Sequence, residues 1–423
     1  MKYNIALLHY SCPPVVGGVE EIMRQHASLL GRHHHNVKVL AGDGGKFADD
    51  MEIEINTLLG SRNREVLDAH QLSFDGKPQE MEGLTRKIYR YLVGSLKDFD
   101  ALIAHNVLTM PFNLPLSAAL HRIGQEGLIP IISWNHDSPY FYPDCPQHLH
   151  LFPWNILKRA YAGIHYVVIS ESRKEMFADL YGAKKRLHVI PNGIDPILFF
   201  LLDTSTVRFI QEQRLFEAEF LMVQPSRLHK RKNMELSIRV TRSLHDLGLK
   251  ARLLITGAHD PHEPKNLTYY HALKNLAAKL GIEDDVLIMA EYAFKSGERL
   301  MVDTITIRDL YLISDILFLP SLQEGFGIPL LESGMIRLPI VCSNIPSFLE
   351  IGGEEVCFFD LAETSESIAR KILEFVETLK PHRMFRKVIR NYAWDNIYQE
   401  KLLPLLNAVI GADRKSNDRA FNP

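Results

Sequence analysis

The sequence predicts an α/β protein of two Rossmann-like, doubly wound domains. Short apolar or β-branched runs, such as YNIALLH, NVKVLAG and LIPIISWN, alternate with longer segments of helical periodicity. That alternation is typical of a parallel sheet covered by helices. The alternation stops after NGID and resumes at EFLMVQPS in a second series of the same kind. The chain, at 423 residues, is also too long for one compact core.

We place the domain boundary in the polar, mostly helical stretch that follows the first series. The first domain is predicted to comprise residues 1–202 and the second residues 203–391. A further segment, YAWDNIYQEKLLPLL at 392–406, has apolar residues near helical spacing and follows a complete second domain. Two such domains facing a central cleft would bring the carboxyl ends of their strands, where parallel sheets bind ligands, to either side of it.

Composition and charge exclude several classes of partner. The chain is 46% apolar and 23% charged, and its net charge of -3 gives no general attraction to nucleic acid. The four cysteines lack CxxC spacing, so neither a disulfide framework nor a zinc site is indicated. No segment approaches the roughly 20 apolar residues of a membrane helix. We expect a cytoplasmic protein with small-molecule partners, and leave peripheral membrane contact and the oligomeric state open. The run 33–35, HHH, is expected to face solvent.

The segment PPVVGGVEE follows the first predicted strand and opens the first helix. Gly17 and Gly18 allow a ligand to approach the backbone N–H groups at the positive helix end, which suits a phosphate or an anionic acceptor. The alternative is a tight strand-to-helix turn, with Glu20 and Glu21 in the first turn where acidic side chains are favoured. The pattern GxGxxG is absent, so both interpretations stay open.

The segment PSRLHKRKN follows the first strand of the second domain. It places Arg227 and Lys232 at the carboxyl end of that strand, where both can point into the cleft. Arg offers a fixed fork for phosphate oxygens and Lys a compact charge, and together they can neutralise a diphosphate. The alternative is a solvated basic turn, because Lys230 and Arg231 belong to the same run.

The segment EGFGIPLLE follows the apolar run DILFLPSLQ. Pro329 fits the first turn of a helix, where its missing N–H costs nothing. Glu332 then lies about one turn into the helix and can accept hydrogen bonds from a ribose diol, while Glu324 at the strand end can reach sugar hydroxyls. The loop between strand and helix, whose amides face the cleft, consists of Gly325, Phe326, Gly327 and Ile328. A helix start with chance acidic residues is the less favoured alternative.

Taken together, these motifs resemble the retaining GT-B glycosyltransferases of family four, the group 1 glycosyltransferases. The acids eight positions apart match the family's E-x7-E motif, and the resemblance covers nearly the whole chain. GGVE, the SRL-to-KRKN segment, VIPNGID and TIRDLYLISDILFLPSLQEGFGIPLLE follow in the family's order. Ser226 and Asn233 stand where the family usually has glycine, but these departures leave both cations in place.

The resemblance implies transfer of a hexose, with glucose or mannose favoured, from a UDP- or GDP-sugar to a hydroxyl acceptor. It implies retention by front-side substitution, in which the leaving phosphate takes the acceptor proton. Arg227 and Lys232 would bind the diphosphate and Glu332 the ribose. Glu324 and the loop from Gly325 to Ile328 would bind the donor sugar, and Gly17 and Gly18 would face phosphate or acceptor.

The resemblance also implies a histidine near the C6 hydroxyl of the donor sugar. IISWNHDSPY nominates His136 as the matching catalytic residue, with His105 as a less favoured substitute. A loop histidine packed against Trp134 or Tyr140 is the structural alternative. The same placement nominates Asp137 and Asn106 for contact with the acceptor, while first-domain loops such as 41–95 carry its specificity without a recognisable motif.

We expect no cofactor and no metal, because the nucleotide sugar is a substrate and the predicted cleft has its own cations. Asp98 and Asp100 spell an Asp-x-Asp pattern, but they precede a strand and so lie at the wrong end of the sheet. The resemblance implies that residues 392–423 return to the first domain. Two alternatives remain, a sugar phosphorylase of related architecture and a catalytically silent protein that binds sugar nucleotides.

Overall fold

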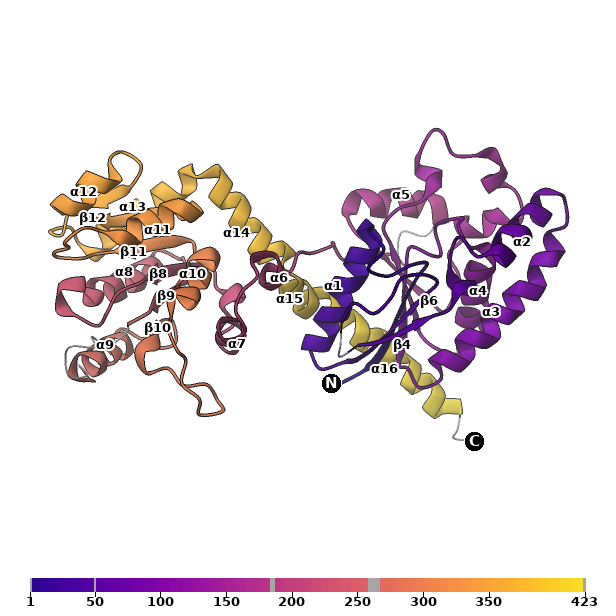
Figure 1. The fold of residues 1–423 in the computed structure, drawn as a ribbon, viewed down its shortest axis with the longest axis horizontal. Coiled ribbons are helices and arrows are strands. Elements are labelled where there is room, and N and C mark those ends of the chain that lie inside the picture. Colours follow the sequence, from indigo (N-terminus) through magenta and orange to yellow (C-terminus); the bar gives the residue numbers. More distant parts are fainter. Residues whose placement is uncertain (1, 49–50, 183–186, 258–266, 421–423) are drawn as a thin grey trace. The chain divides into compact units, whose positions relative to one another are not determined.

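The computed structural model describes residues 2–48, 51–182, 187–257 and 267–420, with side chains described up to residue 411. It divides the chain into two α/β units, and in Figure 1 the first is drawn in indigo to magenta with the yellow terminal helix α16, and the second in magenta to yellow. The first unit combines the chain up to Ile194 with the segment that begins at Ile397, and the second spans Asp195–Asn396.

These limits differ by a few residues from the predicted ones. The apolar run after Asp195 forms a short helix, α6 (Pro196–Phe200), instead of ending the first domain. The Asp195 side chain caps this helix by accepting from the N–H groups of Ile197 and Leu198, and Ile197 packs with Phe209 in a core of the second unit. The local cap and the packing therefore draw this segment into the second unit.

The first unit is built on a seven-stranded parallel sheet with the order β3-β2-β1-β4-β5-β6-β7. Ile5 of β1 lies opposite both Val37 and Ala101, so the neighbours β2 and β4 flank the first strand. Most residues of the inner strands are buried, as expected for a sheet covered on both faces. The strands are β1 (Asn4–His9), β2 (Asn36–Ala41), β3 (Glu52–Ile55), β4 (Ala101–His105), β5 (Ile131–Asn135), β6 (Ile164–Val168) and β7 (Leu187–Val189).

The helices of the first unit connect these strands. Local signals define them well: in α4 the Asn113 side chain accepts from Leu116 N–H, Pro115 lies in the first turn, and Gly127 ends the helix with φ of 65°. The longer helices are α1 (Gly18–Arg32), α2 (Arg64–Phe74), α3 (Met81–Leu96), α4 (Leu114–Glu126) and α5 (Glu171–Tyr181). Short 3-10 turns lie at Thr57–Leu59, Pro78–Glu80, Pro139–Phe141, Gln147–His150 and Trp154–Lys158.

The second unit repeats this architecture with six parallel strands in the order β10-β9-β8-β11-β12-β13. They are β8 (Phe220–Gln224), β9 (Ala251–Ile255), β10 (Val286–Ile288), β11 (Ile316–Leu319), β12 (Ile340–Ser343) and β13 (Cys357–Phe359). The strand order reverses between β1 and β4 in the first unit and between β8 and β11 in the second. Crevices at such reversals are where doubly wound sheets bind ligands.

Helices again cover the sheet of the second unit. The longer ones are α7 (Thr204–Glu212), α8 (Met234–Asp246), α9 (Leu267–Lys279), α10 (Thr304–Ile313), α11 (Ile328–Ile336), α12 (Pro346–Gly352), α13 (Ser365–Thr378) and α14 (Lys380–Tyr392). Short 3-10 turns lie at Leu215–Glu217, Lys230–Lys232 and Met289–Glu291. None of the helices within the described residues is both long enough and apolar enough to cross a membrane.

The last helical segment is made of α15 (Trp394–Ile397), a π-helical turn at Tyr398–Leu402 and α16 (Leu403–Ala420), and it belongs to the first unit from Ile397 onward. His35 Nε2 lies 2.7 Å from the Tyr398 hydroxyl, and the His33 ring stacks on Tyr398 with centroids 3.8 Å apart. The Tyr3 hydroxyl donates to Asn407 Oδ1 at 2.6 Å. The expectation that all of the HHH run faces solvent is therefore wrong, because His35 is buried against this terminal segment.

Candidate active site

The two motifs of the second unit meet at one edge of its sheet. β8 and β11 are parallel neighbours, with Met222 opposite Ile316, so the loops that follow them emerge side by side. Leu322 N–H donates to the carbonyl of Arg231 at 2.8 Å and ties the β11 loop to the β8 loop. The basic and the acidic motifs therefore form one site, which we call the β8–β11 site, made of residues 226–233 and 321–332.

Glu324 is the centre of the β8–β11 site. Lys232 Nζ lies 2.5 Å from its Oε1, Ser321 Oγ donates to the same oxygen at 2.7 Å, and Arg231 Nη1 lies 2.8 Å from Oε2. Burial by itself would raise the pKa of Glu324, but the hydrogen bonds from Lys232, Ser321 and Arg231 outweigh it and lower this pKa. Glu324 is therefore ionised at neutral pH and is held as a hydrogen-bond acceptor.

Two cations contact Glu324, and one of them is not among the residues named from the sequence. Lys232 contacts Glu324, as its position allows, but the second contact comes from Arg231, which the sequence left in a solvated turn. Lys230–Lys232 forms a single 3-10 turn, and this turn directs Arg231 toward the β11 loop. Arg227 lies exposed on the same β8 loop. The sequence gives no signal for this turn, so it could not single out Arg231 within the basic run.

Lys232 is anchored from behind by buried polar groups. The Gln224 side chain donates to the carbonyl of Lys232 at 2.8 Å and accepts from Ser237 Oγ at 2.7 Å. The next residue, Asn233, has φ of 51°, and asparagine is one of the few residues other than glycine that adopt this left-handed conformation readily. This explains why asparagine is tolerated here.

Gly327 determines the shape of the GFGIP loop. Its φ is 132°, and a Cβ at this position would lie 3.1 Å from Phe348 Cδ1 and 3.2 Å from Ile351 Cδ1. Both the backbone conformation and the packing therefore require glycine. The flanking residues Phe326 and Ile328 are 56% and 59% exposed, so the loop presents its side chains and amides outward around one buried glycine.

Glu332 lies in α11, one turn after Pro329, where the prediction placed it. The hydroxyl of buried Tyr311 donates to its Oε2 at 2.8 Å. Burial raises the pKa of Tyr311, and the hydrogen bond to Glu332 raises it further, so the hydroxyl stays protonated and acts as a donor. The other carboxylate oxygen accepts no hydrogen bond from the residues that the structure describes, which leaves it available to a ligand.

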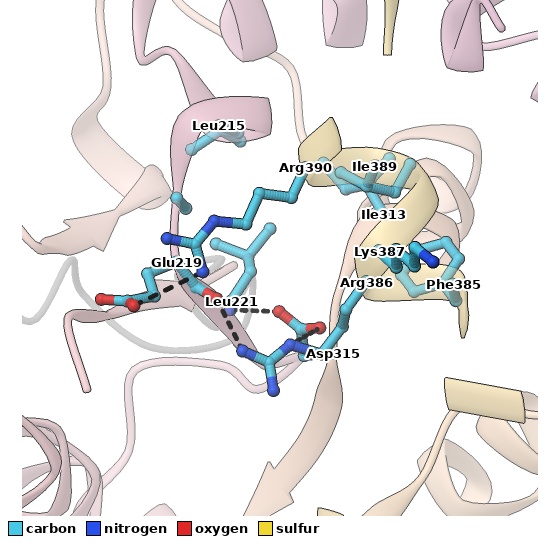
Figure 2. A pocket seen from close by; sticks show the side chains of 11 residues that line it. Leu215, Glu219, Leu221, Ile313, Asp315, Phe385, Arg386, Lys387, Ile389 and Arg390 are labelled. Carbon is cyan, nitrogen blue, oxygen red and sulfur yellow. Dashed lines mark hydrogen bonds and ion pairs between the residues drawn. The ribbon is translucent and has the colours of Figure 1, made fainter. Parts of the chain in front are cut away.

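Figure 2 shows a separate cavity of the second unit, of about 180 Å³, at the opposite edge of the sheet, where β8 and β11 begin. Asp315 accepts from Leu221 N–H at 2.7 Å and lies 3.5 Å from Arg386 Nε. Arg386 donates to the carbonyl of Glu219 at 3.0 Å, and Arg390 lies 3.5 Å from the Glu219 carboxylate. These contacts fasten α14 to the sheet, and we assign this cavity a structural role.

In the first unit, the predicted residues lie at the ends of β4 and β5. Asn106 follows β4 with φ of 56°, and its Oδ1 accepts from the N–H groups of His136 at 3.0 Å and Asp137 at 3.1 Å, and from Thr109 Oγ1 at 3.0 Å. The Asn106 oxygen therefore holds the turn that carries His136, instead of being available to an acceptor. Asp137 pairs with Arg173 at 3.2 Å.

His136 is buried, with 9% of its surface exposed. Its Nδ1 lies 3.2 Å from Asn192 Nδ2, whereas its Nε2 has no hydrogen-bond partner among the described residues. Burial, together with nearby His9, lowers the pKa of His136 to about 4, although Asp137 acts in the opposite direction. His105 is fully buried and its ring lies against that of His136, so it is the less suitable of the two for contact with a ligand.

The two glycines at the start of α1 differ in their surroundings, because a Cβ at Gly18 would meet no atom within 4 Å whereas Gly17 is covered. The Glu20 carboxylate covers Gly17, because a Cβ there would lie 2.1 Å from Glu20 Oε2. Ser11 Oγ donates to Glu20 Oε1 at 2.6 Å, and His9 Nε2 lies 3.8 Å from the same oxygen. A carboxylate above Gly17 opposes an anion at this position.

A cavity of about 550 Å³ opens beside Glu20 within the first unit. Sequence reasoning missed it, because its walls come from the segments after β1, β2, β3 and β4, which carry no common motif. Its polar lining includes His9, Ser11, Glu20, Asp43, Arg62 and Asn106, and its apolar lining includes Val15, Val16, Val19, Met110 and Phe112. We call it the first-unit cavity. In the described ranges, no group of three or more His, Cys, Asp or Glu could hold a metal ion.

Two doubly wound parallel-sheet units, the second with cations and an acid in the loops after β8 and β11, have the architecture of the GT-B class. The family model "Glycosyl transferases group 1" matches residues 206–392, and the model "Glycosyltransferase Family 4" matches residues 16–197. The two matches together span most of the chain, which belongs to the group 1 glycosyltransferases.

Curated relatives align along most of their length. An uncharacterized glycosyltransferase of Methanocaldococcus jannaschii is 26% identical over 94% of this chain and 96% of its own. The mannosylglucosylglycerate synthase of Petrotoga mobilis is 22% identical over 87% and 89%, and the O-antigen chain mannosyltransferase of Salmonella typhimurium 24% over 62% and 66%. A glycosyltransferase structure from Rickettsia africae covers 97% of this chain and 99% of its own at 16% identity, with a TM-score of 0.38.

Proposed function

We propose that the protein is a retaining hexosyltransferase that moves mannose or glucose from a nucleotide diphosphate sugar to a hydroxyl of a small polyhydroxy acceptor, without a metal. The observation that carries this proposal is the Glu324 cluster, in which two cations and a carboxylate lie beside a glycine loop. The names of the mannosyl-transferring relatives support mannose as the first sugar to test and a GDP-sugar as the first donor.

In this proposal the β8–β11 site binds the donor and supplies the positive charge that stabilises the leaving diphosphate. Lys232 and Arg231 neutralise Glu324 in the structure, and Arg227 lies exposed on the same loop. The diphosphate of a bound donor would interact with these cations, and the Glu324 carboxylate would then be able to accept hydrogen bonds from sugar hydroxyls. Preorganised cations beside a leaving diphosphate stabilise the negative charge that grows on it in the transition state.

The ribose contact is proposed for Glu332. Tyr311 fixes one oxygen of this carboxylate, so the other is oriented before a ligand arrives. A carboxylate accepts from both hydroxyls of a ribose diol, and orienting it in advance reduces the entropy lost on binding.

The reaction itself is proposed as front-side substitution. The bond between the anomeric carbon and the diphosphate oxygen breaks, and the acceptor oxygen forms its bond to the same face of the anomeric carbon. The acceptor proton passes to the departing phosphate oxygen, so the products are a glycoside of retained configuration and a nucleoside diphosphate. His136 would donate a hydrogen bond to the donor sugar, and the first-unit cavity would bind the hydroxyls of the acceptor.

A donor screen tests this proposal. The full chain is incubated with GDP-mannose, UDP-glucose and ADP-glucose and a panel of sugar and polyol acceptors, and nucleoside diphosphate release and product mass are recorded. We expect release that depends on the acceptor, with an α-linked product by NMR from an α-linked donor. Phosphorolysis of a glycoside by inorganic phosphate would instead indicate a phosphorylase. Donor binding without transfer to any acceptor would indicate a silent binding protein.

A further inference from the structure

His136 lies beside two polar side chains, Trp134 and Asn192, that have no role in the proposed function. Resting on that function, we propose that Asn192 and Trp134 are positioning residues that hold His136 in the tautomer protonated at Nε2, so that its ring donates a hydrogen bond to a hydroxyl of the donor sugar. Asn192 belongs to the VIPNGID segment before the second unit, and Trp134 lies on β5.

The contact between Asn192 and His136 determines where the ring proton sits. Asn192 Nδ2 lies 3.2 Å from His136 Nδ1, and an amide nitrogen can only donate. His136 Nδ1 must therefore accept, and the proton of the neutral ring is on Nε2.

Trp134 fixes the orientation of the Asn192 amide. Its indole Nε1–H donates to Asn192 Oδ1 at 3.4 Å, and an indole nitrogen cannot accept a hydrogen bond. Turning the amide over would place two donors, the indole N–H and the amide NH₂, against each other at Trp134. Trp134 is fully buried, so its N–H cannot turn to water instead.

The remaining ring nitrogen indicates a ligand. His136 Nε2 is buried and has no hydrogen-bond partner among the described residues. Buried donors are normally paired, so this one points to a partner that arrives with substrate. The backbone is held in place as well, because Asn106 Oδ1 accepts the N–H of His136. The low pKa of His136, near 4, keeps the ring neutral and this tautomer populated at physiological pH.

His9, at the end of β1, shows the opposite arrangement. Its Nδ1 lies 2.6 Å from the carbonyl of His105, which can only accept. His9 is therefore protonated at Nδ1 when neutral, and its Nε2, which faces Glu20 at 3.8 Å, is an acceptor. Two histidines at the carboxyl edge of one sheet thus offer opposite polarity, which makes His9 an internal reference for the tautomer of His136.

The test uses Asn192→Asp, which is isosteric but places an acceptor against Nδ1. The carboxylate should hold a proton on Nδ1 and raise the pKa of His136. Above that raised pKa the neutral ring has no Nε2–H. The kcat/KM of the variant should therefore fall as pH rises, by about tenfold at pH 8 relative to wild type, which is the size of one lost hydrogen bond. Wild type should show no such change from His136.

The tautomer is read independently of transfer by two-dimensional ¹⁵N NMR of the imidazole nitrogens in the full chain, with the His136 signals identified by their absence in His136→Gln. We expect protonated Nε2 in wild type, protonated Nδ1 in Asn192→Asp, and a mixture in Asn192→Ala. Trp134→Phe keeps the aromatic bulk but removes the indole donor, and should also give a mixture. The His9 signals should stay unchanged in all three variants.

Each outcome decides the proposal. Protonated Nδ1 in wild-type His136, or an Asn192→Asp variant with the spectrum and pH profile of wild type, would overturn it. Because the NMR measurement needs no substrate, the tautomer assignment can succeed even if no donor or acceptor is found. If the tautomer shifts as expected while kcat/KM does not respond, Asn192 orients the ring but the Nε2–H does not serve the reaction, and the proposal fails.

Discussion

Lys232 and Glu324, 92 positions apart in the sequence, face each other in the β8–β11 site, with 2.5 Å between Nζ and Oε1. The pair is partly buried, with 15% and 13% of the two side chains exposed, so water screens it only in part. A diphosphate that binds here must compete with a carboxylate for the same ammonium group. The site is therefore neutralised internally, and its cations are already oriented before the donor arrives.

The pair gives a first prediction. Lys232→Met should weaken the binding of nucleoside diphosphate by about tenfold or more, because it removes a charged hydrogen-bond donor and leaves the Glu324 carboxylate less compensated. Titration calorimetry with GDP and UDP measures this. Lys279→Met, an exposed lysine of α9, is the matched control and should bind as wild type. Equal affinity of the two variants would remove Lys232 from the phosphate site.

A second prediction separates Glu332 from the tyrosine that orients it. Glu332→Gln should reduce nucleotide affinity by about tenfold, since a charged acceptor is replaced by a neutral amide. Tyr311→Phe should reduce it by only about twofold to fivefold, because the carboxylate remains and loses only its orientation. If Glu332→Gln folds normally and binds as tightly as wild type, the ribose assignment is wrong.

The GFGIP loop gives a third prediction, about stability. Gly327→Ala should lower the free energy of unfolding by about 1 to 3 kcal/mol, because a Cβ at φ of 132° is strained and meets Phe348. Gly325→Ala is the control, as a Cβ there meets nothing within 4 Å. Urea unfolding followed by circular dichroism compares them. Equal losses in both variants would contradict the conclusion that Gly327, in contrast to Gly325, must be a glycine.

The buried histidines of the first unit predict sensitivity to acid. Burial lowers the pKa of His26 to about 3 and that of His136 to about 4, from an ordinary value near 6.5. As the pH falls, the unfolded chain binds protons at these histidines before the folded chain does. They therefore do not reduce the free energy of unfolding above pH 6.5, and they reduce it progressively as the pH falls toward 4. For His26 the loss by pH 4 is about 3 kcal/mol.

Thermal unfolding from pH 7.5 to pH 4 measures this loss, and His26→Leu is the comparison. In this variant an apolar side chain fills the buried position and no group titrates there. Its unfolding temperature should therefore decline less steeply as the pH falls. Parallel curves for wild type and His26→Leu would show that His26 is not held neutral.

The fifth prediction is that transfer survives chelation. The proposed reaction uses Lys232, Arg231 and loop amides for the leaving diphosphate, so EDTA should leave the rate within about twofold. Complete loss in EDTA, restored by Mn²⁺ or Mg²⁺, would contradict it. A modest stimulation by added divalent ions would not, because free ions can assist release of the nucleotide.

The two doubly wound sheets could be predicted because strand and helix periods alternate clearly, and a parallel sheet places each strand's carboxyl end at one edge. That geometry places Lys232 and Glu324 together without further information. The contact of Arg231 with Glu324 could not be predicted, because the run HKRK has no period of its own and only the 3-10 turn decides which cation faces the acidic loop.

The first-unit cavity and the contacts of His136 were also beyond the sequence. Glu20 over Gly17, Asn106 on the His136 turn and Asn192 on the His136 ring are contacts between loops at different strand ends, and their partners depend on side-chain orientation. Polar residues at strand ends show that a site exists. They do not show which of them face a ligand and which hold their neighbours.

The stacking of His33 and the hydrogen bond of His35 on Tyr398 have a practical meaning for protein engineering. Because the last helix completes the first unit, residues 1–194 alone are not a sensible expression fragment. A chimera that exchanges the first unit between related enzymes must carry Tyr398 and Asn407 along with the amino-terminal half. A swap at a single junction would leave Tyr3 and the paired histidines facing a foreign helix.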